Sequence, residues 1–164
     1  MLDDKLLLEL QTYITKHLHT CLHMIEESTE SMMLDDLNEN EISHFINNHR
    51  KPTLNQVLFH FIDRTGENDA AIYHRAGIDR RHFFKIRSNP NYTPKKNTLL
   101  ALALALELNK DDTNDLLNAA GYSLSESDTG DLIVQFCLEK QIYDIHLVNL
   151  ALDQFHLKPL TNAL

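Results

Sequence analysis

A glycine between two short capped segments constrains the fold of this chain more than any other feature. Residues 68–88 read NDAAIYHRAGIDRRHFFKIRS. Asn68 and Asp79 are residue types preferred at helix N-termini, because their side chains accept hydrogen bonds from free backbone amides. Gly77 lies between them and can adopt the positive φ of a tight turn without a Cβ clash. The segment therefore predicts two short helices joined by a sharp turn.

The second of these helices is expected to be basic on its outer side. Phe83 and Ile86 are three residues apart and predict its buried side, with Ile78 tucked under the turn. Four cationic side chains are then left pointing outward, namely Arg80, Arg81, Lys85 and Arg87. Two short helices joined through a glycine turn, the second one basic, are typical of the helix-turn-helix motif.

The distribution of charge supports a surface for phosphate. Residues 74–96 hold seven Lys or Arg and one acid, a net charge of +6, whereas the whole chain of 164 residues has a net charge of −9. The rest of the chain therefore carries −15. A concentrated basic stripe on an acidic protein is typical of nucleic-acid binding. The alternative is a solvated helix face whose cations pair with acids elsewhere in the chain.

Segments between Thr53 and Tyr122 carry a resemblance to a known family. They read TLNQVLFHFIDRTG, then residues 68–88, then TPKKNTLLALALALELN and DDTNDLLNAAGY. Together they resemble the lambda-repressor/Cro-like helix-turn-helix domains, which implies an all-α fold of five helices. The wording IDRRHFFKIRSNPNYTPKKNTLLALALALELN is also similar to a bacterial subfamily in which this module follows other domains, some of them ADP-ribose-binding macro domains. The 50 residues upstream are too few for a macro domain, so we expect no such domain here.

Two positions depart from the family's pattern. The first helix of such motifs usually begins with Gln, which in the family helps to hold the DNA backbone, and Asp69 occupies that end here. Four residues before the turn glycine the family prefers a small residue, and this chain has Tyr73. We expect the bulky ring either to open the crossing of the two helices or to lie at the edge of the core.

Composition narrows the class of protein. Only four Gly and four Pro, with abundant Leu, indicate an all-helical chain, and 43% hydrophobic residues are ordinary for a globular protein. Cys21 and Cys137 stand without paired metal-ligand spacing, which favours a reduced, cytoplasmic setting. The longest apolar stretch, residues 99–106, is too short to cross a bilayer. Asp3 and Asp4 occupy the place where a signal peptide would be basic.

Residues 1–50 are expected to form an N-terminal helical segment used for oligomerisation. A helix over residues 4–26 has an apolar seam that includes Leu7, Leu10, Ile14 and Leu18. We expect this seam to make a homodimer contact; the alternative is that the helix folds back onto a single core. His19 and His23 have a spacing that can hold a metal, but no further ligand accompanies them, so no metal is expected. A second helix should begin at Asn38 and end before the segment HRKP, the expected domain boundary.

Residues 51–164 are expected to form the helix-turn-helix domain with two extra C-terminal helices. Thr53 and Gln56 predict a capping box for a helix that ends at Gly66. The run LLALALALEL alternates as a strand would, but Leu and Ala favour a buried helix. The core stripe expected for the first helix is Leu54, Val57, Leu58, Phe61 and Ile62. Later helix starts are expected at Thr93, at Asp111 or Asp112, at Ser125 with Asp128, and at Asp144, whose helix should turn Ile145, Val148, Leu152 and Phe155 inward.

No catalytic residue or cofactor is expected, because the sequence lacks a phosphate-binding glycine loop, a nucleophile elbow and zinc spacing. For double-stranded DNA, the residues expected at base edges or nearby phosphates are Arg80, Arg81 and Lys85, with His82 and Arg87 at the flanks and Lys95 and Lys96 on phosphate. Phe84 is expected in the core, the alternative being an exposed apolar contact. The competing function is a protein-interaction module, such as a defence- or toxin-linked regulatory partner, that keeps the fold without reading DNA.

Overall fold

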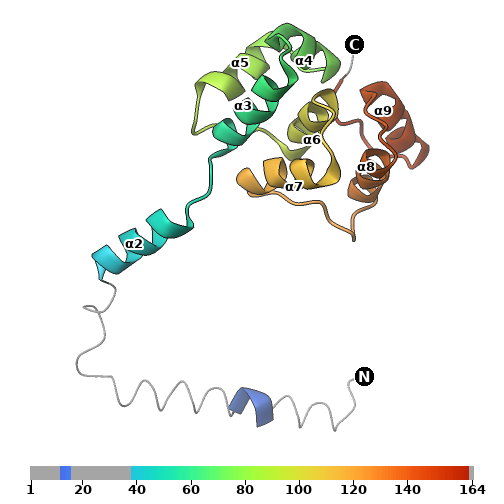
Figure 1. Ribbon diagram of the computed structural model, residues 1–164. Helices are drawn as coiled ribbons and strands as arrows, with labels where there is room; N and C mark the ends of the chain where they lie inside the picture. The colour runs from blue at the N-terminus through green and yellow to red at the C-terminus, as the bar shows by residue number, and fades with distance from the viewer. Residues whose placement is uncertain (1–11, 16–37, 163–164) are drawn as a thin grey trace. The chain divides into compact units, whose positions relative to one another are not determined.

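Every regular element that the structure describes is a helix, as the sequence predicts (Figure 1). This computed structural model describes residues 12–15 and 38–162. The chain divides into two compact units, residues 1–50 and 51–164. The described helices are α2 (Glu39–His49), α3 (Leu54–Thr65), α4 (Asp69–Arg75), α5 (Arg80–Ser88), α6 (Lys96–Ala105), α7 (Lys110–Ala119), α8 (Thr129–Glu139) and α9 (Ile145–Gln154), after a helical stretch at residues 12–15. No described helix has the length and apolar character that crossing a bilayer requires.

The first unit contributes α2 to the described residues. The side chain of Asn38 accepts a hydrogen bond from the Asn40 backbone at 3.0 Å, so the expected N-cap is confirmed. Phe45 is 61% exposed and stacks on His49 with ring centroids 3.9 Å apart. Of the predicted dimer seam, Ile14 is exposed, whereas Leu7, Leu10 and Leu18 lie outside the described residues, as do Cys21, His19 and His23.

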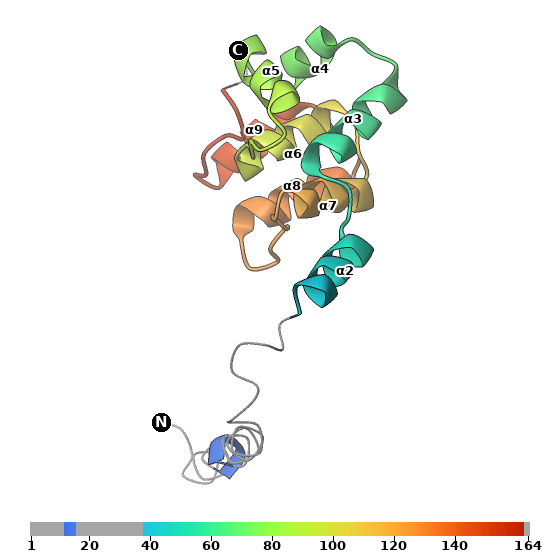
Figure 2. The same cartoon turned by 90° about the vertical axis from the view of Figure 1, so that its left-hand side faces the viewer.

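The second unit is built around α6. Residues 98–105 of this helix are all buried, and it contacts α4, α7 and α9. In both views α6 occupies the middle of the unit, among α3, α4, α7 and α9 (Figures 1 and 2). Its alternating alanines present only methyl groups, which lets the neighbouring helices approach closely. The Leu-Ala run is therefore a buried helix, as its composition predicts.

The helix before the α4–α5 pair begins and ends where local signals predict. The Thr53 amide donates to Gln56 Oε1 at 2.9 Å and the Gln56 amide donates to Thr53 Oγ1 at 3.4 Å, which completes the capping box of α3. Gly66 ends the helix with a φ of 67°. The core stripe is buried at Leu54, Leu58, Phe61 and Ile62 and half-buried at Val57.

Other helix starts differ from the prediction by two or three residues. The first residue of α6 is Lys96, with Lys95 rather than Thr93 at the N-cap. The Pro94 carbonyl, just before this start, accepts a 3.2 Å hydrogen bond from Tyr122 Oη. Asn109, not Asp111 or Asp112, caps α7 by accepting from the Asp112 amide at 2.8 Å. These two acids instead lie in the first turn, where negative charge suits the helix dipole.

The last two helices and the tail close the unit against α4 and α6. Asp128 caps α8 by accepting from the Asp131 amide at 2.9 Å. The expected capping box with Ser125 is absent, since the Ser125 amide donates to the buried Asp131 carboxylate at 2.7 Å. Thr161 Oγ1 donates to the Ala76 carbonyl at 2.9 Å, and the tail runs beside α4 (Figure 1). Phe155 is 59% exposed, so its expected inward position is wrong. The helix ends at Gln154, which removes Phe155 from the inward register of α9.

Candidate nucleic-acid interface

The turn between α4 and α5 has the geometry that the sequence predicts. Asn68 caps α4 by accepting from the Ala71 amide at 2.8 Å, and Asp79 caps α5 by accepting from the His82 amide at 2.9 Å. Between the two helices Gly77 has a φ of 64°, in the region that favours glycine. Ile78 is buried directly after the turn. The caps and the turn together fix the direction in which α5 leaves α4.

The buried side of α5 anchors the helix in the core. Phe83 and Ile86 are buried, as predicted. The Tyr73 ring is half-buried and packs against Phe83 with centroids 5.6 Å apart. Of the two expected positions for this ring, the structure has the one at the edge of the core. The contact stabilises the α4–α5 crossing instead of preventing it.

Three of the seven cations between residues 74 and 96 are engaged with acids of the same unit. Arg87 pairs with Asp69 at the start of α4 and lies over the Phe59 ring at 5.3 Å. Lys96 pairs with the buried Asp131 of α8. Arg75 pairs with Glu67 in the segment that precedes α4. Arg87 and Lys96, both predicted to contact DNA, therefore each form an ion pair within the second unit. Asp69, at the position where the resembled family usually has Gln, is the partner of Arg87.

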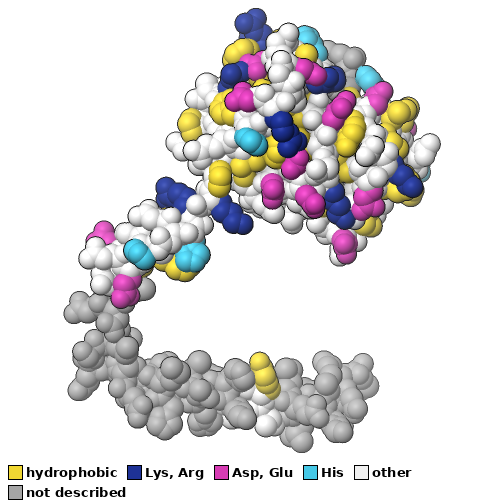
Figure 3. Space-filling view, in the orientation of Figure 1, with side chains coloured by type: hydrophobic (Ala, Val, Ile, Leu, Met, Phe, Trp, Pro, Cys, Tyr) yellow, Lys and Arg dark blue, Asp and Glu magenta, His cyan; other side chains and the backbone are white. Residues whose placement is uncertain are grey.

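The other four cations are exposed and have no carboxylate partner among the residues that the structure describes; they are Arg80, Arg81, Lys85 and Lys95. Lys85 Nζ lies over the Tyr92 ring at 4.2 Å, and His82 Nε2 lies 3.2 Å from Tyr92 Oη, so His82 is turned toward the following loop. Figure 3 shows Lys and Arg side chains interspersed with Asp and Glu side chains at the α4–α5 end of the second unit.

An aromatic ring interrupts this basic face. Phe84 is 42% exposed, and the Arg80 guanidinium lies over its ring at 5.4 Å. The expectation that Phe84 belongs to the core is therefore wrong. With about 100° of rotation per residue, Phe84 stands one turn above Arg80 on the exposed side, while Phe83 takes the core position. That helical spacing was the signal in the sequence that could have placed it.

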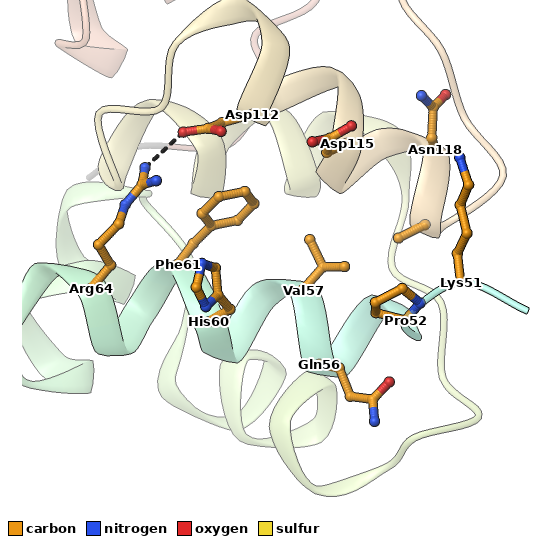
Figure 4. Close-up of a pocket in the computed structure, with 11 residues that line it drawn as sticks. Lys51, Pro52, Gln56, Val57, His60, Phe61, Arg64, Asp112, Asp115 and Asn118 are labelled. Atoms are coloured by element: carbon orange, nitrogen blue, oxygen red, sulfur yellow. Dashed lines mark hydrogen bonds and ion pairs between the residues drawn. The ribbon is translucent and has the colours of Figure 1, made fainter.

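A groove lies between α3 and α7 (Figure 4). This groove has a volume of about 810 Å³ and apolar walls at Val57, Phe61 and Ala119. At one end Arg64 pairs with Asp112 at 2.7 Å, and Asp115 of α7 also lines the groove. Its lining comes from α3, α7 and residues 51–52, so the groove is separate from the exposed face of α5.

Two groups with clear pKa shifts lie on α8, away from the basic face. The pKa of Glu139 is lowered, chiefly because Lys110 donates a hydrogen bond to it at 3.1 Å and Gln135 donates another at 3.2 Å. Burial raises the pKa of the Cys137 thiol. Among the described residues no cluster of His, Cys, Asp or Glu has the arrangement of a metal site.

Inference about function rests on the geometry described above, because the comparisons with known proteins found no match. No protein-family model matches the sequence, and neither a curated protein nor a solved structure matches the chain.

Proposed function

We propose that this chain is a non-enzymatic, sequence-specific DNA-binding regulator of the lambda-repressor/Cro-like helix-turn-helix type. In this proposal α4 and α5 are the motif, and α5 enters the major groove. The observation that supports it is the exposed face of α5, where Arg80, Arg81 and Lys85 have no acid partner among the described residues. Cations that are left unpaired in a chain of net charge −9 are available to phosphates and base edges.

The proposal gives different roles to the cations that have an acid partner and to those that have none. Arg80 and Arg81 lie in the first turn of α5, the part of a recognition helix that meets base edges, and arginine can engage guanine through two hydrogen bonds. Lys95 is exposed at the start of α6, and we propose that it contacts phosphate. Arg87 and Lys96 act on DNA indirectly in this proposal, because they hold α5 and α8 in position.

The proposal includes a cytoplasmic homodimer. One recognition helix covers a single short half-site, so useful affinity requires two copies that read half-sites about 34 Å apart, one turn of DNA. The N-terminal seam of Leu7, Leu10, Ile14 and Leu18 is the proposed contact between the two copies. Its place in residues 1–50 separates the dimer contact from the residues proposed for DNA.

The first experiment measures the salt dependence of binding. Fluorescence anisotropy with a pool of random-sequence duplexes, followed by selection of the best sites, would show whether the full chain binds DNA and prefers a sequence. If roughly four cations per protomer neutralise phosphates, log affinity should fall against log salt with a slope near −0.9 for each one. Binding that is absent at low salt, or that does not weaken as salt rises, would contradict the proposal.

The second experiment separates base contacts from phosphate contacts. Arg80→Ala or Arg81→Ala should relax preference for the selected site by about 1–3 kcal/mol for a lost bidentate contact. Lys95→Ala should weaken all duplexes alike. Arg64→Ala is the matched control, because it removes the same charge from α3, where the guanidinium pairs with Asp112. If Arg80→Ala and Lys95→Ala weaken selected and random DNA equally, α5 does not read bases.

A protein-interaction module remains the second candidate, and exposed apolar side chains on α8, on α9 and directly after α9 favour it. The large ones are Leu132 and Phe136 on α8, Leu147 and Leu150 on α9, and Phe155 after the end of α9. Such side chains add apolar contact area in a protein interface. Absence of DNA binding at low salt, together with retention of a protein partner that Phe136→Asp releases, would favour this function over DNA binding.

A further inference from the structure

The position of Phe84 raises a question that the cations alone do not answer. A helix of 3.6 residues per turn places Arg80, Phe84, Ser88, Arg81 and Lys85 in that order around an arc of about 140°. All five are exposed, and the opposite arc holds the buried Phe83 and Ile86. The ring of Phe84 therefore stands between the two arginines of the first turn, on the same face as the unpaired cations.

An apolar ring at that point has a matching group in DNA. In the major groove thymine presents a methyl group on C5, whereas cytosine, adenine and guanine present polar edges without one. A phenyl ring that contacts this methyl removes apolar surface of both partners from water. The neighbouring guanidinium groups suit the N7 and O6 acceptors of guanine, so the face of α5 offers one apolar reader between two polar ones.

We propose that Phe84 is a specificity-determining residue that contacts the 5-methyl group of a thymine in the bound site. This inference rests on the proposed function, because it requires α5 to lie in the major groove. The Phe84 ring packs edge-on against the buried Phe83 with centroids 6.3 Å apart, and this contact supports its position on the exposed side of α5.

The competing role for Phe84 is a platform for Arg80. The guanidinium lies over the ring at 5.4 Å, so the ring could orient the arginine without touching DNA. The two roles differ in one measurable respect. A platform is indifferent to the thymine methyl, whereas a methyl contact is lost when thymine is replaced by uracil with all hydrogen-bonding groups unchanged.

The test uses the full chain and duplexes selected from a random pool. Each thymine of the best selected duplex is replaced in turn by deoxyuridine, and affinity is measured at fixed salt. We expect one thymine per half-site at which the replacement weakens binding about fourfold, the effect of one buried methyl-sized group. Replacing that base pair by one that carries 5-methylcytosine should recover more affinity than replacing it by one with cytosine.

Variants then tie the methyl effect to the ring. Phe84→Ala should bind thymine and uracil duplexes equally, and Phe136→Ala, which removes an exposed ring from α8, should keep the fourfold difference. Circular dichroism of each variant checks that it remains folded. If the wild-type chain binds the selected duplex but shows no loss at any uracil, or if Phe84→Ala keeps the loss, the inference is wrong while the proposed function stands. If no duplex is selected at all, the proposed function itself fails.

Discussion

Replacing Lys96 by alanine removes the side-chain partner of a buried carboxylate. Asp131 is 7% exposed. Its carboxylate pairs with the Lys96 ammonium and also accepts a hydrogen bond from the Ser125 amide at 2.7 Å. Breaking a fully buried ion pair costs about 3–5 kcal/mol. The Lys96 side chain keeps 26% of its exposure, so solvent already screens part of the pair and we expect a smaller loss, about 2–3 kcal/mol of unfolding free energy.

The neighbouring lysine provides the matched control. Lys95 is exposed and has no acid partner among the described residues, so Lys95→Ala should change the unfolding free energy by no more than about 0.5 kcal/mol. Urea unfolding followed by circular dichroism measures both variants. In Lys96→Ala combined with Asp131→Ala, the loss should be smaller than the sum of the two single losses, because no unpaired charge remains buried.

DNA binding should rank the two lysines in the opposite order. Lys95→Ala should flatten the slope of log affinity against log salt by about 0.9, the effect of one phosphate contact. Lys96→Ala should leave the slope unchanged once the folded fraction is taken into account. Equal stability of the two variants, or equal flattening of the slope, would refute the assignment of Lys96 to the fold and Lys95 to phosphate.

Three further predictions concern the turn, a shifted pKa and the N-terminal segment. Gly77→Val and Gly66→Val both place a β-branched residue at a φ near 65°, so each should cost about 1–3 kcal/mol in a urea melt, but only Gly77→Val should also weaken DNA binding per folded molecule. Lys110→Met should raise the Glu139 pKa toward its ordinary value in an NMR titration. Because the folded-state pKa is lowered, the Glu139 carboxylate stabilises the fold at pH values above its unfolded-state pKa. This stabilisation is lost as the pH falls through the folded-state pKa. Deletion of residues 1–50 should give a folded monomer in sedimentation with weaker DNA binding; a dimer after deletion would move the contact to the second unit, and an insoluble product would make the N-terminal helix part of the core.

Local sequence patterns were sufficient to predict several helix N-caps. Thr53, Asn68 and Asp79 cap their helices as predicted. The cap of α7 was misplaced because Asn109, Asp111 and Asp112 all suit an N-cap and are two or three residues apart. The local sequence does not distinguish these three residues, and α7 also packs on α3 and α6, which are contacts that no local pattern contains.

Which cations of the candidate site are paired depends on acids that are distant in the sequence. Lys95 and Lys96 are adjacent and chemically identical, yet only Lys96 faces Asp131, which is 35 positions further along the chain. Arg87 likewise cannot be separated from Arg81 until α4 brings Asp69 beside it. The ends of three helices could not be predicted from glycine positions. The residues with positive φ after these helices are Glu107, Gln141 and His156, where glycine is the usual residue.

The hydrogen bond from Thr161 to the Ala76 carbonyl sets an order in time for the newly made chain. It joins residues 85 positions apart, at the end of α4 and in the C-terminal tail. A ribosome adding 5–20 residues per second needs roughly 4–17 s to make the intervening chain. The α4–α5 pair can form early from its own caps and core residues. The carbonyl at the end of α4 receives this partner only when residue 161 has emerged, so the C-terminal end of α4 gains its tail contact later than the caps and core contacts of the α4–α5 pair.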